Sequence, residues 1–268
     1  MSGRAFFVNS ALAFATAELL TAALHETCHG LVAQALGFAP KIYAFYEDNP
    51  TGSAVQSAAI LAAGPLGSLF LGGLFRLWYV RSKGRSGFWR LLLFWLAWLG
   101  IMEFVNYLIV TPWLTAGDTA QLADIFGAPL WSRYAVALLG AVFVFLLAPY
   151  ATADMFAIAP AGTPLEEFRA RRRYIVRGFY LPLFAGVVLT GVAGIGGRPE
   201  FVFFGLLGTL GNSDIVGASF SVRRPIVTPP PLAQPIAAAQ PGIEPAGIAL
   251  YVALVLFYIL VLSRGMAV

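Results

Sequence analysis

Long apolar runs alternate with short polar connections along the whole chain. Six of these runs extend over residues 5–36, 54–80, 88–111, 131–158, 174–195 and 247–264. About 20 helical residues, at a rise of 1.5 Å each, cross the roughly 30 Å hydrocarbon core of a bilayer. The pattern therefore predicts an all-α polytopic membrane protein with about six transmembrane helices.

The connections between the runs are unusual in three places. Residues 37–54 alternate aromatic and polar side chains around an Asn-Pro-Thr-Gly turn signal, which predicts a short membrane-associated β-hairpin after the first helix. Residues 111–130 are too interrupted by Pro and Gly to cross the bilayer and too apolar for an ordinary loop. Irregular backbone at membrane depth is stable only when protein buries it or when it lines a wet cavity. The 111–130 segment is therefore expected beside a functional site.

The third connection, residues 196–246, begins with a short apolar piece and ends in a proline-rich stretch. We expect a re-entrant or interfacial segment followed by an extended external linker. The chain then divides into a core at 1–195, built around the first three helices and the 111–130 segment, an external connection at 196–246, and a C-terminal transmembrane helix within 247–268.

Composition agrees with a membrane protein, since 59% of the 268 residues are hydrophobic and 11% are charged. The arginines cluster at 76–90 and 169–177, in contexts too short and too apolar for nucleic-acid binding. Positively charged loops favour the cytoplasmic side, which predicts a multi-pass chain with both termini in the cytoplasm. The expected partners are the lipid bilayer and a membrane-anchored protein, with no nucleic acid, and the sequence does not indicate an oligomeric state.

The first apolar run contains the chain's most informative polar residues, in the stretch HETCHG. His25 and His29 are four residues apart, so on a helix they lie on one face and can bind one metal ion. Glu26 adjoins the first histidine and can reach a water molecule in an open coordination position. This is the His-Glu-x-x-His pattern in which glutamate acts as the general base.

These residues could instead be satisfied polar groups of a helix core. The spacing argues against that interpretation, because the chain has two histidines and both fall in this pattern. A charged group at the centre of a bilayer helix also costs about 2.5–3.5 kcal/mol. A divalent cation would offset that cost and would explain why the three groups occur together.

Two histidines leave a catalytic zinc ion one protein ligand short. Asp118 is the preferred third ligand, because it lies in the broken 111–130 segment and the neighbouring Gly117 allows the backbone to turn. Asp124, Glu103 and Asp154 remain alternatives. Asp118 could also be a helix N-cap, with or without a ligand role.

Three stretches resemble the site-2 protease family of intramembrane zinc metalloproteases. They are HETCHG at 25–30, AAGPLGSLFLGG at 62–73 and NYLIVTPWLTAGD at 106–118. The resemblance implies one zinc ion per chain, held by His25, His29 and Asp118, with Glu26 as the catalytic base. It also implies that the 37–54 hairpin offers a strand edge for an unwound substrate.

The second and third stretches imply substrate contacts at Gly64, Ser68 and Asn106. For Ser68 the alternative is close helix packing through small residues, and Asn106 could instead support a zinc ligand or join two helices.

The sequence thus predicts a zinc metalloendopeptidase that cleaves membrane-anchored proteins. Two other functions remain open, a catalytically silent membrane scaffold and a zinc transporter or sensor, each using the same metal site.

Overall fold

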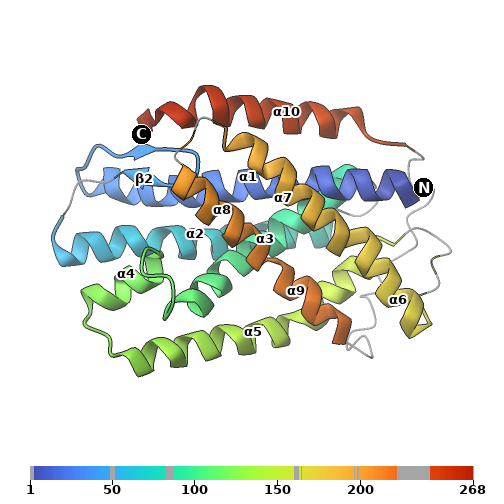
Figure 1. Ribbon diagram of the computed structural model, residues 1–268, viewed down its shortest axis with the longest axis horizontal. Coiled ribbons are helices and arrows are strands. Elements are labelled where there is room, and N and C mark those ends of the chain that lie inside the picture. Colours follow the sequence, from blue (N-terminus) through green and yellow to red (C-terminus); the bar gives the residue numbers. More distant parts are fainter. Residues whose placement is uncertain are drawn as a thin grey trace.

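A computed structural model of the chain describes residues 3–48, 52–82, 87–159, 163, 165–195, 197, 199–221 and 242–267. Helices that run roughly along the long axis make up most of it (Figure 1). Within the described residues, six helical stretches are long and apolar enough to cross a membrane: α1 (Gly3–Ala35), α2 (Ala54–Arg81), α3 (Phe88–Val110), α5 (Leu130–Phe156), the continuous run 168–193 and the run 245–264. The predicted all-α polytopic membrane fold is confirmed.

The fifth and sixth runs each combine several elements. The fifth joins α6 (Phe168–Ile175), a π-helical turn η1 (Val176–Tyr180) and α7 (Leu181–Ala193). It begins earlier than predicted, because the arginine cluster forms the polar first turns of the helix instead of a loop. The sixth joins α10 (Pro245–Leu260) to a 3-10 turn, η3 (Leu262–Arg264).

The predicted hairpin forms between α1 and α2. Gly37, with a φ of 86°, lies just beyond the end of α1, and Ser53 begins α2 with a reciprocal capping box to Gln56. Between these helix ends, β1 (Lys41–Ile42) pairs antiparallel with β2 (Glu47–Asp48). A third strand, β3 (Met266–Ala267), pairs with the other edge of β1, which gives the order β2-β1-β3.

Aromatic side chains fill the core between α1, α3 and the fifth run. Phe14, Trp95 and Phe179 are almost fully buried, and the ring centroids of Phe14 and Trp95 lie 4.9 Å apart in an edge-to-face contact. On the other side of α3, Gly72 and Gly100 let α2 approach closely, since a Cβ at Gly72 would lie 2.6 Å from the backbone nitrogen of Ile101. These contacts fix α2 and α3 against α1.

Helices α8 (Pro199–Gly211) and α9 (Ser213–Ala218), with the turn η2 (Ser219–Ser221), lead the chain back along the bundle. Thr209 reaches Glu18 in the middle of α1, and the ring of Phe220 packs on Tyr180 in η1. The Glu244 backbone N–H donates to Asn9 near the start of α1, and the Phe88 N–H at the start of α3 donates to the Glu244 carboxylate, so α10 begins beside the starts of both helices. Helix α10 therefore runs in the same direction as α1.

The sequence predicts a topology in which both termini share one side of the membrane and residues 196–246 lie on the other. The two termini lie at opposite ends of the bundle (Figure 1). Residue 244 lies at the end of the bundle where α3 begins, next to Gly87 and Phe88. The return through α8 and α9 was not predicted as a crossing because a break at Asn212 leaves two short helices. The proline-rich stretch at 222–241 lies outside the described residues.

Reporters fused to the two ends of the chain test this arrangement. Because α10 runs parallel to α1, we expect an N-terminal and a C-terminal reporter to lie on opposite sides of the membrane. Protease protection of the two tags in sealed vesicles measures this. If both tags are protected, or both are digested, in vesicles of one orientation, the two ends lie on the same side and the return through α8 and α9 is contradicted.

Candidate metal centre

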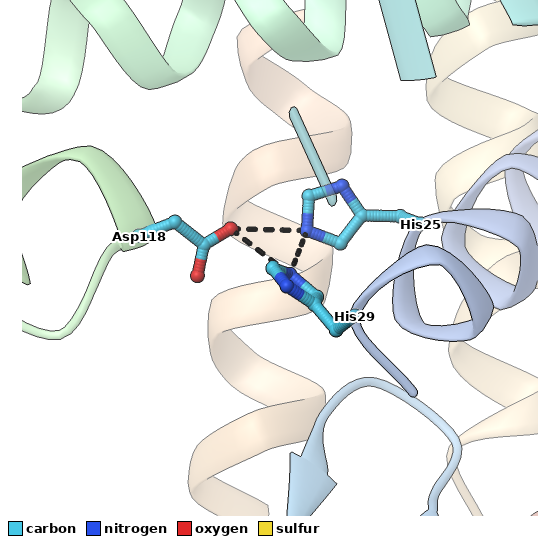
Figure 2. Close-up of side chains that lie close together, drawn as sticks. All are labelled: His25, His29 and Asp118. Atoms are coloured by element: carbon cyan, nitrogen blue, oxygen red, sulfur yellow. Dashed lines mark hydrogen bonds and ion pairs between the residues drawn. The ribbon is translucent and has the colours of Figure 1, made fainter. Parts of the chain in front are cut away.

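The two histidines project from one face of α1 into the bundle, where Asp118 meets them from the first residue of α4 (Asp118–Ile125) (Figure 2). His25 and His29 are each 2% exposed. His25 lies ten residues and His29 six residues before the end of α1 at Ala35, so the site lies near the end of the bundle where the hairpin begins. The residues predicted as metal ligands are therefore brought together.

The three atoms that face one another are the Nε2 atoms of both histidines and Oδ2 of Asp118. The two nitrogens are 3.0 Å apart, and Oδ2 lies 3.1 Å from His25 Nε2 and 3.3 Å from His29 Nε2. Ligand atoms placed tetrahedrally at 2.0–2.1 Å from zinc are about 3.3 Å from one another. The spacing therefore fits one small cation, and these residues form a group able to hold a metal ion.

The contacts of Nδ1, the second nitrogen of each ring, explain why both Nε2 atoms present lone pairs to the site. His29 Nδ1 lies 2.7 Å from the carbonyl oxygen of Ile60, which can only accept a hydrogen bond. His25 Nδ1 lies 3.2 Å from a carboxylate oxygen of Glu103. Each Nδ1 therefore carries the proton, and a neutral ring then has its lone pair on Nε2. With the rings in this neutral form three acceptors face one another, and either a proton or a metal ion between them would remove the repulsion.

Glu103 is thus placed behind His25 and not among the ligands. A carboxylate that accepts the Nδ1 proton of a ligating histidine fixes the ring orientation and makes the other nitrogen a better donor to a metal. The hydroxyl of Ser68 lies 3.1 Å from the same Nδ1 atom. Both residues therefore orient His25, and Glu103 has a role other than the third ligand considered from the sequence.

Gly64 of α2 faces the two ligand nitrogens. A Cβ at this position would overlap His29 Nε2 and lie 2.6 Å from His25 Nε2. Any larger residue would therefore occupy the space next to the metal ligands. The substrate contacts predicted for Gly64 and Ser68 stay predictions, but both residues lie directly beside the site.

Hydroxyl groups hold the start of α4 against α3. The Thr119 hydroxyl donates to the backbone oxygen of Tyr107 at 2.7 Å, and the Thr111 hydroxyl lies 2.8 Å from that of Thr119. Gly117 precedes Asp118 in an extended conformation with a φ of −78°, which most residues can adopt. The suggestion that Gly117 is needed for backbone freedom is therefore wrong, and Asp118 is the first helical residue, following an N-cap at Gly117.

The electrostatic surroundings keep Asp118 ionised. Burial by itself would raise the pKa of this carboxyl, but hydrogen bonds and positive charge from His25 and His29 outweigh burial and hold the pKa well below its ordinary value. In the metal-free protein, protonated imidazoles supply this positive charge. A proton bridges one pair of atoms at a time, whereas a metal ion can contact both Nε2 atoms and Oδ2 of Asp118 together.

The remaining alternatives for the third ligand lie elsewhere. Asp124 forms an ion pair with Arg133 and its side chain is largely exposed. Asp154 accepts hydrogen bonds from Arg76 and Trp98. Of the acidic residues considered, Asp118 alone joins the two histidines in the described part of the chain.

Asn106 belongs to a separate, partly buried polar network. Its amide donates to the side chain of Asn212 at 3.2 Å, and Thr209 donates to Glu18 at 2.7 Å. Asn212 also lies 3.4 Å from Glu18, so the network joins α1, α3 and the end of α8. Of the two roles considered for Asn106 besides substrate contact, the joining of two helices agrees with these contacts.

Glu26 lies beside the ligands without taking part in their contacts. It is 9% exposed and makes no hydrogen bond or ion pair in the described part of the chain. It is close enough to His25, His29 and Asp118 to interact with them electrostatically. A carboxylate of this kind, free of protein donors, is available to a water molecule.

Two residues near the ligands were not found by sequence reasoning. Tyr107 stacks on His25 with an interplanar angle of 7°, and its hydroxyl lies 3.4 Å from His25 Nε2. Its position four residues after Glu103 on α3 is a signal that could have found it, because such residues share a helix face. Glu47 of β2 lies within electrostatic range of His29 and Asp118, and burial raises its pKa to about 7. Its place in the predicted 37–54 hairpin gave no such signal, because nothing along the chain shows which face of the hairpin meets the histidines.

Comparison of the chain with protein-family models, curated proteins and solved structures finds no match. The site is therefore interpreted from its own geometry.

Replacement of Asp118 tests the ligand set. Purified wild-type protein is expected to hold one zinc ion per chain, and Asp118→Ala is expected to lose most of it because only two ligands remain. Elemental analysis after dialysis measures the content. Asp124→Ala is the matched control, since the largely exposed Asp124 carboxylate pairs with Arg133 and does not belong to the ligand group. Full zinc retention in Asp118→Ala, or equal loss in the control, would contradict the assignment.

Proposed function

We propose that the chain is an intramembrane zinc metalloendopeptidase that hydrolyses peptide bonds of membrane-anchored protein substrates. The observation that carries the proposal is the cluster of two imidazole nitrogens and a carboxylate oxygen, 3.0–3.3 Å apart inside a membrane helix bundle, with the unpaired Glu26 beside it.

The ligand set favours a catalytic metal over a structural one. Structural zinc sites are usually closed by four protein ligands, whereas catalytic sites use three and leave a position open. His25, His29 and Asp118 supply three, and no fourth ligand joins them in the described residues. When bound, zinc would supply Lewis acidity, lowering the pKa of a water molecule and polarising a peptide carbonyl.

Glu26 is assigned the role of general base. Its carboxylate would take a proton from the attacking water and later deliver that proton to the leaving amine nitrogen. The absence of a competing donor in the described residues leaves both tasks open to it. The Tyr107 hydroxyl, 3.4 Å from His25 Nε2, would donate a hydrogen bond to the carbonyl oxygen of a peptide bound at the metal.

The supporting residues keep His25 in one orientation during these steps. Glu103 and Ser68 hold Nδ1, so the imidazole cannot rotate without breaking those contacts. Gly64 leaves room beside the ligand nitrogens, where a peptide carbonyl could approach. We therefore retain Gly64 as a substrate contact and assign Ser68 a positioning role as well.

A substrate helix must unwind before its backbone can reach the site, because helical carbonyls are already hydrogen-bonded. The small sheet next to the site has β2 at one edge, and an edge strand can pair with an extended peptide. The cleaved bond is therefore expected in a segment of the substrate that is readily unwound.

The variant Glu26→Gln separates catalysis from metal binding. We expect it to keep one zinc ion per chain, because Glu26 is not a ligand, and to cleave a membrane-anchored substrate at least about 100-fold more slowly. Cleavage by purified protein in lipid nanodiscs measures this, with metal content measured on the same samples. Glu167→Gln, an exposed carboxylate at the start of α6, is the control.

Three results would count against the proposal. Unchanged cleavage by Glu26→Gln would remove the base. Zinc binding without cleavage of any membrane-anchored protein would favour the scaffold, and zinc uptake into sealed vesicles that contain the wild-type protein would favour the transporter.

A further inference from the structure

Glu47 is a carboxylate near the metal centre to which the proposed reaction assigns no role. It lies on β2, where successive side chains point to opposite faces of the sheet. Asp48 faces outward and is exposed, whereas Glu47 is half-buried. Its Oε2 atom is buried and has no hydrogen-bond donor among the described residues. A buried carboxylate oxygen without a donor is costly, so this position suits a ligand that brings one.

The charge around Glu47 indicates the sign of that ligand. Glu47 is close enough to His29, Asp118 and Glu26 to interact with them electrostatically. Neither Glu47 nor Glu26 has an ion-pair partner within the described parts of the chain. Glu26, Glu47, Glu103 and Asp118 together carry more negative charge, when ionised, than one divalent ion can balance. The surplus favours a cationic group.

Glu47 lies outside the coordination group itself. The atoms that lie close enough together to share a metal ion belong to His25, His29 and Asp118. The unpaired carboxylate of Glu47 is therefore left for a group that approaches the site from outside.

The sheet indicates the direction of approach. Strand β1 is paired on both edges, by β2 and by β3, so the outer edge of β2 has no strand partner in the described residues. An extended peptide paired with this edge would place the Cβ of one residue about 4.5–5.5 Å from the Cβ of Glu47, on the same face. Because Glu47 is close enough to His29, Asp118 and Glu26 to interact with them electrostatically, such a peptide would lie beside the metal centre.

We propose that Glu47 is a specificity residue that selects substrates with a lysine or arginine side chain close to the cleaved bond. This inference rests on the proposed protease function. The basic side chain would donate to the half-buried carboxylate of Glu47 and balance the surplus negative charge. Opposite charges across an interface contribute to the choice of partner, and like charges exclude the wrong one.

Synthetic single-span peptides with one varied position test the inference. Lys, Gln or Glu is placed in turn at each position around the cleaved bond, and kcat/KM is measured with zinc-loaded protein in nanodiscs. At one position we expect wild-type protein to prefer Lys over Gln by about tenfold. In Glu47→Gln the kcat/KM of the Lys peptide should fall to that of the Gln peptide, while the kcat/KM of the Gln peptide stays unchanged. In Glu47→Lys the Glu peptide should become the best substrate.

Asp48→Asn is the matched control, since it removes a carboxylate from the next residue on the outward face. It should keep the wild-type preference for Lys. Equal loss of activity by Glu47→Gln on every peptide would contradict the inference and indicate a structural role. A Lys preference that survives in Glu47→Gln would also contradict it.

A binding measurement separates this inference from the proposed function. Affinities of the Lys and Gln peptides are compared for Glu26→Gln and for Glu26→Gln combined with Glu47→Gln. If the Lys peptide binds more tightly than the Gln peptide only when Glu47 is present, the inference is supported, even if the wild-type protein cleaves no peptide. Absence of cleavage would overturn the proposed protease function and not the role of Glu47. Equal binding of both peptides to both variants would overturn the inference.

Discussion

Three hydrogen-bond acceptors that face one another inside an apolar bundle set the central constraint on this protein. The Nδ1 contacts of His25 and His29 direct both Nε2 lone pairs toward Oδ2 of Asp118. Without a positive charge between them these atoms would repel one another, and the low dielectric of the surroundings would strengthen that repulsion. A bound cation turns the same arrangement into a stabilising one.

The neighbouring helices are arranged around this constraint. Helix α2 approaches closely enough that a side chain at Gly64 would collide with the ligands, and its Ile60 carbonyl fixes His29. Helix α3 supplies Glu103 behind His25 and Tyr107 stacked on it. The glycines at 72 and 100 allow α2 and α3 to pack tightly enough for both to reach α1. Packing and ligand orientation are thus achieved by the same contacts.

Sequence reasoning recovered the elements whose signal is local. The spans follow from the length of the apolar runs, and His25 and His29 from spacing on one helix. Asp118 was reached through its position in a broken segment. The role of Glu103 was missed because nothing along the chain shows which nitrogen it meets. Strand β3 is two residues long and has no periodic pattern, and the break at Asn212 hid the return through α8 and α9. These features depend on contacts between residues far apart in sequence.

X-ray absorption at the zinc edge of the purified, zinc-loaded protein tests the central claim most directly. The account predicts a first shell of nitrogen and oxygen at about 2.0–2.2 Å, with the multiple-scattering pattern of two imidazoles. A spectrum that shows no imidazole or only one imidazole would contradict it. A sulfur atom of Cys28 at about 2.3 Å from the zinc ion would also contradict it.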